Sequence, residues 1–205
     1  MQRMVEVLRW LRLNAAFMIA GFLITGALIA LAPQTMLAAF GGLARFYEAL
    51  GARGAASFAS DAEVFSHILQ RNAIAALAYF VVGMLLQAPL GVILGGAFYG
   101  FVAFLAPLTI GRSFAANDWL LVTVEAFALV FSASLASAVA GELYGVAPSL
   151  RGWWHYFRES WRSLSMKPIR PVRESLARWA GLLEIGLVVV AAILLFVAWF
   201  ETYGY

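Results

Sequence analysis

The sequence predicts an all-α membrane protein, a bundle of helices that cross a lipid bilayer. Of its 205 residues, 63% are hydrophobic and 12% are charged, and the mean hydropathy is +0.86. A soluble domain is only about half apolar, because it has to keep a wetted surface. The apolar residues are gathered into runs of the length that a helix needs to cross a bilayer, about 20 residues. The bilayer is therefore the first partner that the sequence implies.

Five apolar runs are predicted to be the membrane-spanning helices of a single domain covering residues 1–205, accompanied by one or two interfacial amphipathic helices. The runs are 14–32, 73–88, 90–110, 119–143 and 179–200. The first is longer than the apolar core of a typical signal peptide, so we expect a retained span. The stretch 73–110 is too long for one helix, and Pro89 disfavours helix in the residue before it. A hairpin turn is therefore expected at residues 87–89, either tucked among neighbouring helices or lying shallowly in the headgroups.

The segments between these runs are predicted to lie near the membrane surface. Ser60 and Glu63 have the spacing of a capping box, so an interfacial helix is expected to begin there and to turn into the bilayer at Asn72. Residues 36–50 carry an apolar stripe at helical spacing. Aromatic and basic residues share a further helix at 151–164, which is typical of a helix at headgroup depth. The residues of this helix that are predicted to contact the headgroups or a partner are Arg151, Trp154, Arg158, Trp161 and Arg162. This helix is either a connector lying on the membrane or a docking surface for a partner protein.

The distribution of basic residues predicts an N-terminus inside the cell and a C-terminus outside. Five spans place ten of the fourteen lysine and arginine residues on the side of the N-terminus, and inner loops carry the excess of such residues. We therefore expect a multi-pass protein of the cell membrane. The net charge of +3 is too small and too scattered for nucleic-acid binding and fits lipid headgroups better.

Two carboxylates, Glu125 and Glu184, fall inside predicted spans. A charge there is expensive unless it is neutral, paired, or facing water or protein. Glu142 closes the fourth run, where it could meet Arg12 or Arg178. Glu125 and Glu184 are predicted to lie at different depths and not to form one dyad. They are either two stations of a proton or cation path or, as the sequence slightly favours, structural hydrogen-bond acceptors.

Small residues in the third and fourth runs predict close helix packing. The fourth run is rich in alanine and carries Ser132 seven residues after Glu125, on the same helix face. The third run has glycines at the spacing that lets two helix backbones touch. These are Gly91, Gly95, Gly96 and Gly100. We expect these two helices to form the tight centre of the bundle and to shield Glu125 from lipid.

Catalytic and cofactor-binding motifs are missing from the sequence. It has no cysteine and no GxSxG, HExxH, P-loop or dinucleotide-binding pattern. His67 and His155 fall on opposite sides of the membrane in the five-span arrangement, so they cannot share a metal ion. We therefore expect a protein without enzymatic activity, bound metal or cofactor.

Three stretches resemble the stage II sporulation protein M family of small polytopic membrane proteins, over about residues 60–205. They are "HILQRNAIAALAYFVVGMLLQAPLGVILGGAFYG", "VEAFALVFSASLASAVAG" and the closing "AAILLFVAWFETYGY". The resemblance implies functional importance for Glu125, the glycine-rich third run and Glu201. The sequence departs from the family at Thr123 and Val124, where a His-Gly pair is common, and lacks the proline that follows Thr202 in the family. The sporulation member is similar to a membrane anchor that recruits peptidoglycan-remodelling partners.

Two functions remain in view. The first is a non-enzymatic membrane scaffold that positions partner proteins, or associates as a homo-oligomer. The alternative is a small transporter or channel subunit that uses Glu125 and Glu184 to pass protons or cations.

Overall fold

The computed structural model describes residues 2–39, 60–110, 116–163, 168–169 and 171–204. Within these ranges every regular element is an α-helix. The helices are α1 (Gln2–Leu31), α3 (Asp61–Met84), α4 (Ala88–Ile110), α5 (Ala116–Tyr144), α6 (Leu150–Ser163) and α7 (Val172–Tyr203). Residues 33–39 are also helical, and the rest of the predicted stripe at 36–50 lies outside the described residues.

Helices α1, α5 and α7 are long and apolar enough to cross a membrane, and α4 is apolar over the shorter stretch Ala88–Phe104. Large aliphatic side chains cover the outward faces of the bundle, among them Leu23 and Val188, which are more than half exposed. Such continuous apolar surface is unfavourable in water and is the expected outer face of a protein in lipid. These features identify a helical membrane protein.

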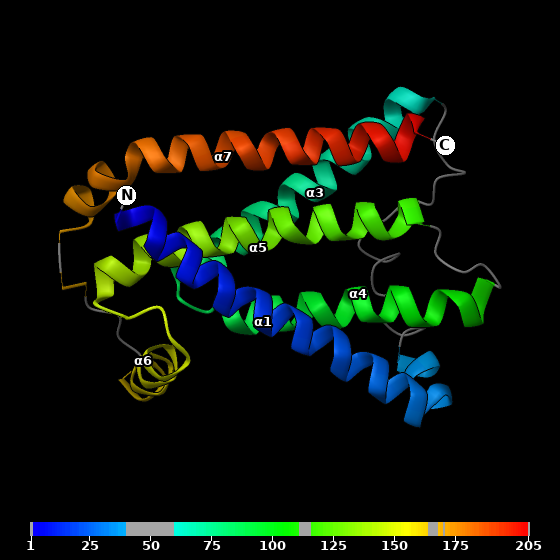
Figure 1. Cartoon of the computed structure of the whole chain (residues 1–205), viewed down its shortest axis with the longest axis horizontal. Helices are drawn as coiled ribbons and strands as arrows, with labels where there is room; N and C mark the ends of the chain where they lie inside the picture. The colour runs from blue at the N-terminus through cyan, green and yellow to red at the C-terminus, as the bar shows by residue number, and fades with distance from the viewer. Residues whose placement is uncertain (1, 40–59, 111–115, 164–167, 170, 205) are drawn as a thin grey trace.

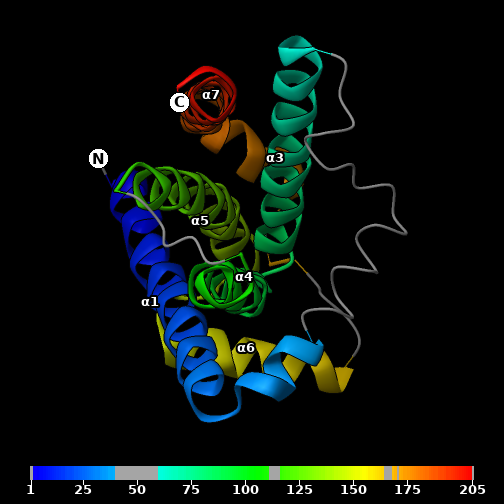
Figure 2. The same cartoon turned by 90° about the vertical axis from the view of Figure 1, so that its right-hand side faces the viewer.

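The long helices run alongside one another, and α6 lies across one end of them (Figures 1 and 2). The start of α1, the end of α5 and the start of α7 lie toward this end, which we call the α6 end. The starts of α3 and α5 and the end of α7 lie toward the opposite end, which we call the C-terminal end. Helix α5 lies in the middle and packs on α1, α3 and α7. Between Ala128 and Gly141 all of its residues except Phe131 are buried.

The helices are longer than the predicted spans. Helix α1 begins at Gln2 and carries the basic residues ahead of the first apolar run. Helix α3 is continuous from Asp61 to Met84, so the prediction of a separate interfacial helix that turns at Asn72 was wrong. No proline or glycine interrupts this segment before Gly83, so nothing local breaks the helix. The predicted cap is confirmed, because the Ser60 side chain accepts a hydrogen bond from the Glu63 N–H at 3.3 Å.

The turn between α3 and α4 comes slightly earlier than predicted, at residues 85–87, and Pro89 falls in the first turn of α4. Leu86 has a φ of 54°, a left-handed conformation that usually calls for glycine. The N–H groups of Leu86 and Gln87 donate to the carbonyls of Gly83 and Val82, both at 2.9 Å. These two bonds form a Schellman motif that closes the helix.

Helix α6 covers this turn. Leu86 is fully buried, and its carbonyl accepts a hydrogen bond from Trp153 Nε1 at 2.9 Å. The Trp153 ring also meets the edge of Phe17 from α1 at 5.4 Å between centroids. Of the two expected positions for the uncharged turn, the structure therefore has the one tucked among neighbouring helices.

The closest helix contacts involve backbone atoms opposite glycines. A Cβ at Gly96 of α4 would collide with the Met18 carbonyl of α1, and one at Gly21 of α1 would collide with the Ile93 carbonyl of α4. Helices α4 and α1 therefore pack together, while α4 and α5 meet only slightly. The expectation that α4 and α5 form the tight centre was wrong.

The other predicted glycines of α4 have different neighbours. Gly100 also faces α1, at Phe22, whereas Gly91 and Gly95 face Val82 and Tyr79 of α3. Helix α5 packs closely against α3, where a Cβ at Gly83 would collide with the Ala133 carbonyl. Small residues do bring backbones together as predicted, but each small-residue face meets a different helix from the one expected.

The contact at Gly96 predicts a position-specific loss of stability. We expect Gly96→Ala to destabilise the fold, because the added methyl group collides with a carbonyl oxygen that cannot rotate away. Gly181→Ala is the matched control, since no atom lies within 4 Å of its missing Cβ. Both variants gain the helix propensity of alanine, so the difference between them isolates the collision, at roughly 1–3 kcal/mol. Unfolding with a denaturing detergent measures both. Equal stabilities would contradict the close α1–α4 contact.

Candidate functional site

Glu125 is a half-buried carboxylate in the first part of α5, toward the C-terminal end of the bundle. The hydroxyl group of Tyr99 on α4 donates a hydrogen bond to it. Tyr99 itself is almost completely buried. Glu125 is thus bound by a side chain of a neighbouring helix, and this direct partner is an aromatic hydroxyl rather than a small residue.

Two further ionisable side chains act on Glu125 from other helices. Arg71 of α3 is close enough to attract it, and Glu201 of α7 is close enough to repel it. Arg71 also attracts Glu201. We call Arg71, Tyr99, Glu125 and Glu201 the Arg71 cluster. It joins α3, α4, α5 and α7, which otherwise differ in their packing partners.

Polar groups of α3 extend the Arg71 cluster into the bundle. Asn72 is buried, and its Oδ1 accepts a hydrogen bond from Arg71 Nε at 3.3 Å. The Asn72 amide nitrogen has no hydrogen-bond partner among the described residues. The hydroxyl of Tyr79 occupies the space beside Gly95, where a larger residue would displace it, and lies within electrostatic range of Tyr99. The site therefore continues from the charged side chains into a set of neutral hydrogen-bonding groups.

The charges of the Arg71 cluster do not cancel when both acids are ionised. Among the residues that the structure describes, one guanidinium acts on two carboxylates, so full ionisation of both acids leaves one negative charge that a proton or a cation would balance. Within the described part of the chain, no three histidine or acidic residues come together as ligands for a metal ion. An unmatched charge is energetically costly within a membrane, so the chemical role of these side chains is to balance one another's charges.

The predicted acidic residues lie in three separate places: the Arg71 cluster, the exposed face of α7, and the α6 end, where Glu142 lies. Glu125 and Glu201 meet in the Arg71 cluster. Glu184 is exposed on α7 and takes no part in the cluster. The sequence did not lead to the prediction that Arg71 is the basic partner of Glu125. The predicted orientation places Arg71, Glu125 and Glu201 near the same membrane surface, and this shared depth could have indicated the pairing.

Glu142 forms a second ionic contact, at the α6 end. Its Oε1 pairs with Arg178 at 3.3 Å, and its Oε2 accepts a hydrogen bond from Trp179 Nε1 at 2.6 Å. Of the two expected partners, the structure selects Arg178. This contact ties the end of α5 to the first turns of α7.

The serines of α5 bond to neighbouring backbone and side chains. Ser132 Oγ donates to the Ala76 carbonyl at 2.9 Å, and Ser137 Oγ is 3.4 Å from the Gly83 carbonyl, both on α3. Ser134 donates to the carbonyl one turn back and accepts from the side-chain amide of Asn14 on α1 at 3.0 Å. Ser132 is therefore a contact between α5 and α3, and it does not join Glu125 despite the shared helix face.

The predicted docking residues lie on α6, but the side chain that anchors this helix is Trp153. Trp153 is 3% exposed and bonds to the α3–α4 turn, whereas Trp154 is 54% exposed. Arg151 and Arg158 are exposed as well. Trp161 and Arg162 belong to α6, and their side chains lie outside the described residues. Sequence spacing alone could not decide which of two adjacent tryptophans faces the bundle.

The fold and these contacts define a helical membrane protein with a charged cluster between four helices at one end and an amphipathic helix across the other. Comparison of the chain with models of known protein families, with curated proteins and with solved structures found no match. The resemblance to the stage II sporulation protein M family therefore stays an expectation from the sequence.

The hydrogen bond to Glu125 can be tested with a pair of tyrosine variants. We expect Tyr99→Phe to lower the free energy of unfolding by about 0.6–2 kcal/mol, the range of interhelical hydrogen bonds in membrane proteins. Tyr203→Phe is the control, because this tyrosine is half exposed on α7 and should change stability by less than about 0.5 kcal/mol. Detergent-induced unfolding followed by tryptophan fluorescence provides the measurement. A Tyr99 variant as stable as the Tyr203 variant would exclude a stabilising bond.

Proposed function

We propose that the protein is a non-enzymatic scaffold of the cell membrane that positions partner proteins through α6, the role that the family resemblance also implies. In this proposal α1, α3, α4, α5 and α7 are five spans, with the N-terminus inside and the C-terminus outside. The arginine distribution supports this orientation: of the arginine side chains that the structure describes, all except Arg71 lie toward the α6 end.

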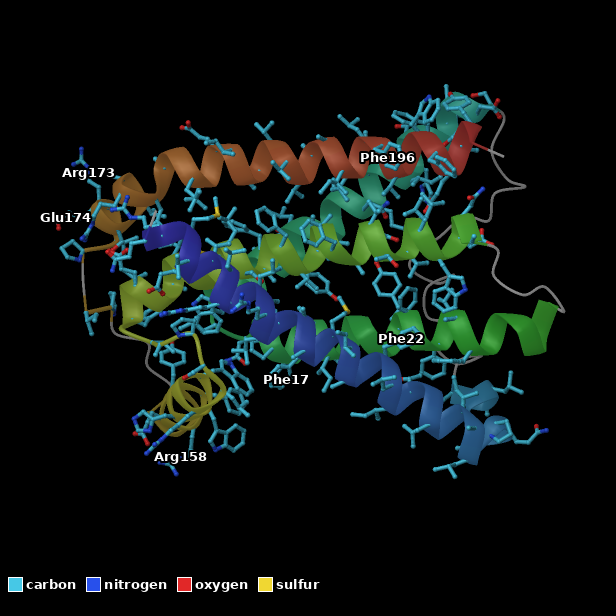
Figure 3. The ribbon with its side chains drawn as sticks, viewed as in Figure 1. Phe17, Phe22, Arg158, Arg173, Glu174 and Phe196 are labelled. Atoms are coloured by element: carbon cyan, nitrogen blue, oxygen red, sulfur yellow. The ribbon has the colours of Figure 1, made fainter. Side chains whose placement is uncertain are left out.

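The observation that carries the proposal is the way α6 is held. Trp153 fixes the helix to the α3–α4 turn and to Phe17, so the opposite face is presented in one orientation. That face carries Trp154 and Arg158, and Figure 3 shows Arg158 pointing away from the bundle. Tryptophan and arginine are enriched among the residues that dominate binding energies. A surface that is already ordered also loses less entropy on binding.

The interior supports a scaffold over a conducting path. Beyond Glu125, the buried polar side chains of α5 are Ser132, Ser134 and Ser137, and each makes a hydrogen bond to a backbone carbonyl. Ser132 and Ser137 bond to α3 and Ser134 accepts a hydrogen bond from α1, so these hydroxyl groups connect helices. The polar interior of α5 thus fits a static bundle.

The scaffold proposal predicts a partner that depends on the exposed face of α6. Crosslinking in native membranes followed by affinity purification should recover a protein, or a second copy of the chain, with the wild type. We expect the triple variant Arg151→Ala, Trp154→Ala, Arg158→Ala to reduce its recovery at least about tenfold, since each lost hot-spot residue typically costs 1–2 kcal/mol or more. Arg173→Ala is the control, because it removes an exposed arginine at the same end but outside α6 (Figure 3).

Trp153→Phe adds a second arm to this experiment. It replaces the indole with a smaller aromatic ring and removes the hydrogen bond to Leu86, so it should weaken binding by loosening α6 while every exposed residue stays in place. Unchanged recovery with the triple variant, or a wild type that crosslinks to nothing, would refute the scaffold.

A second candidate function, passage of protons or cations, is favoured by one observation, the excess of carboxylates over guanidinium groups in the Arg71 cluster. It predicts pH-dependent flux in liposomes that contain the purified protein. Glu125→Gln should abolish this flux, whereas Glu184→Gln should preserve it, because Glu184 is exposed outside the cluster. Liposomes without flux would eliminate this function and leave the scaffold.

A further inference from the structure

A cleft of about 1030 Å³ opens at the α6 end, between the first turns of α1, the end of α5 and the start of α7. Its volume is at the upper limit of typical small-ligand sites, about 300–1,000 Å³. Its charged lining consists of Arg3, Glu6, Arg9, Glu142 and Arg178. The cleft is far from the Arg71 cluster and contains none of its residues.

The cations of the cleft are only partly matched by its acids. Glu142 is already engaged by Arg178 and by the Trp179 indole N–H. Glu6, between Arg3 and Arg9 on α1, is the remaining acid of the lining. Neither Arg3 nor Arg9 forms an ion pair with a residue that the structure describes. Two guanidinium groups therefore face the cleft with one carboxylate between them, and their donors are available for an anion.

The arrangement of the walls holds these guanidinium groups around a shared space. The Arg3 guanidinium lies over the Trp179 ring at 5.9 Å, so it reaches across from α1 to α7. Trp179 is in turn fixed by its bond to Glu142. The ion pair with Glu142 leaves Arg178 with further N–H donors, since a guanidinium carries five. Arg3 is thereby positioned by a stacked ring, and Arg178 by a salt bridge, before any ligand arrives.

A buried donor lies next to Gly141, a residue of the cleft wall. Gly141 lines the cleft, and the position of its missing Cβ is 3.1 Å from Trp10 Nε1. Trp10 is completely buried, and this N–H has no hydrogen-bond partner among the described residues. A buried donor without a partner is unusual, and this one lies directly behind a residue of the cleft wall.

We propose that this cleft binds a phosphate group, supplied by the headgroup of an anionic phospholipid. Guanidinium groups bind phosphate oxygens in pairs, with more directional hydrogen bonds than an ammonium group makes. Met4 and Leu182 add apolar lining that suits the glycerol and the first methylenes of a lipid. Basic pockets between membrane helices on the cytoplasmic side are a known form of lipid-headgroup recognition. The ligand follows from the cleft itself and does not require α6 to act as a docking surface.

The first test measures lipid retention by native mass spectrometry of the full chain, purified from nanodiscs of phosphatidylcholine containing phosphatidylglycerol. The wild type should retain phosphatidylglycerol in preference to phosphatidylcholine. The double variant Arg3→Gln, Arg9→Gln should retain at least about tenfold less phosphatidylglycerol, because two charge-assisted contacts are lost. Arg12→Gln is the matched control, an exposed arginine of the same helix outside the cleft, and should bind as the wild type does.

A second variant keeps the test independent of misfolding. Glu6→Gln removes the carboxylate between the two arginines and should increase retention of phosphatidylglycerol, a gain that a damaged fold would not produce. Inorganic phosphate is tested in parallel in detergent. Phosphate binding that needs Arg3 and Arg9, without lipid retention, would support the phosphate site and identify a soluble ligand.

Two results would overturn the proposal. One is equal retention of phosphatidylcholine and phosphatidylglycerol by the wild type, together with no binding of inorganic phosphate. The other is equal loss in the double variant and in Arg12→Gln, which would show that surface charge of α1, and not the cleft, attracts the lipid.

Discussion

The site depends on the interactions of Glu125 with the Tyr99 hydroxyl and with the positive charge of Arg71. A carboxylate in the apolar part of a membrane protein is tolerated only with a counter-charge, hydrogen-bond donors or water around it. Tyr99 supplies a hydrogen bond and Arg71 supplies the charge, while Glu201 shares the same arginine. Because these residues come from α3, α4, α5 and α7, satisfying one acid constrains where four helices meet. The cluster is therefore both a candidate functional site and a structural junction at the C-terminal end of the bundle.

Close backbone approach makes this junction possible. Gly83 brings α3 against the Ala133 carbonyl of α5, and along the same interface the hydroxyl of Ser132 reaches the Ala76 carbonyl. This interface also carries Arg71 alongside the helix that holds Glu125. On the other side, Gly96 and Gly21 let α4 approach α1, which fixes the face of α4 that carries Tyr99. Dispersion contacts and interhelical hydrogen bonds replace the hydrophobic effect as the source of helix association in lipid. Glycine placement and the polar site thus depend on one another.

The two ends of the bundle use their charges differently. At the C-terminal end one arginine is shared by two acids, and the polar groups lie between helices. At the α6 end the arginines outnumber the acids around an open cleft, and α6 presents a further basic and aromatic face. The excess positive charge at one end fits the side of a membrane that faces anionic headgroups. In the proposed scaffold, a lipid in the cleft and a partner on α6 would both be bound at this end of the bundle.

The sequence by itself determined the helical membrane character, the cap at Ser60 and the pairing of Glu142 with one of two arginines. Each of these follows from local composition or short spacing, because length, hydropathy and helical period are properties of a single segment. The tertiary structure alone decided that α4 packs on α1, that Arg71 serves Glu125, and that Trp153 rather than Trp154 anchors α6. Those outcomes depend on how surfaces distant in the chain fit together. Apolar helix faces with small residues are compatible with several partners, so the partner is selected by the packing of the whole bundle.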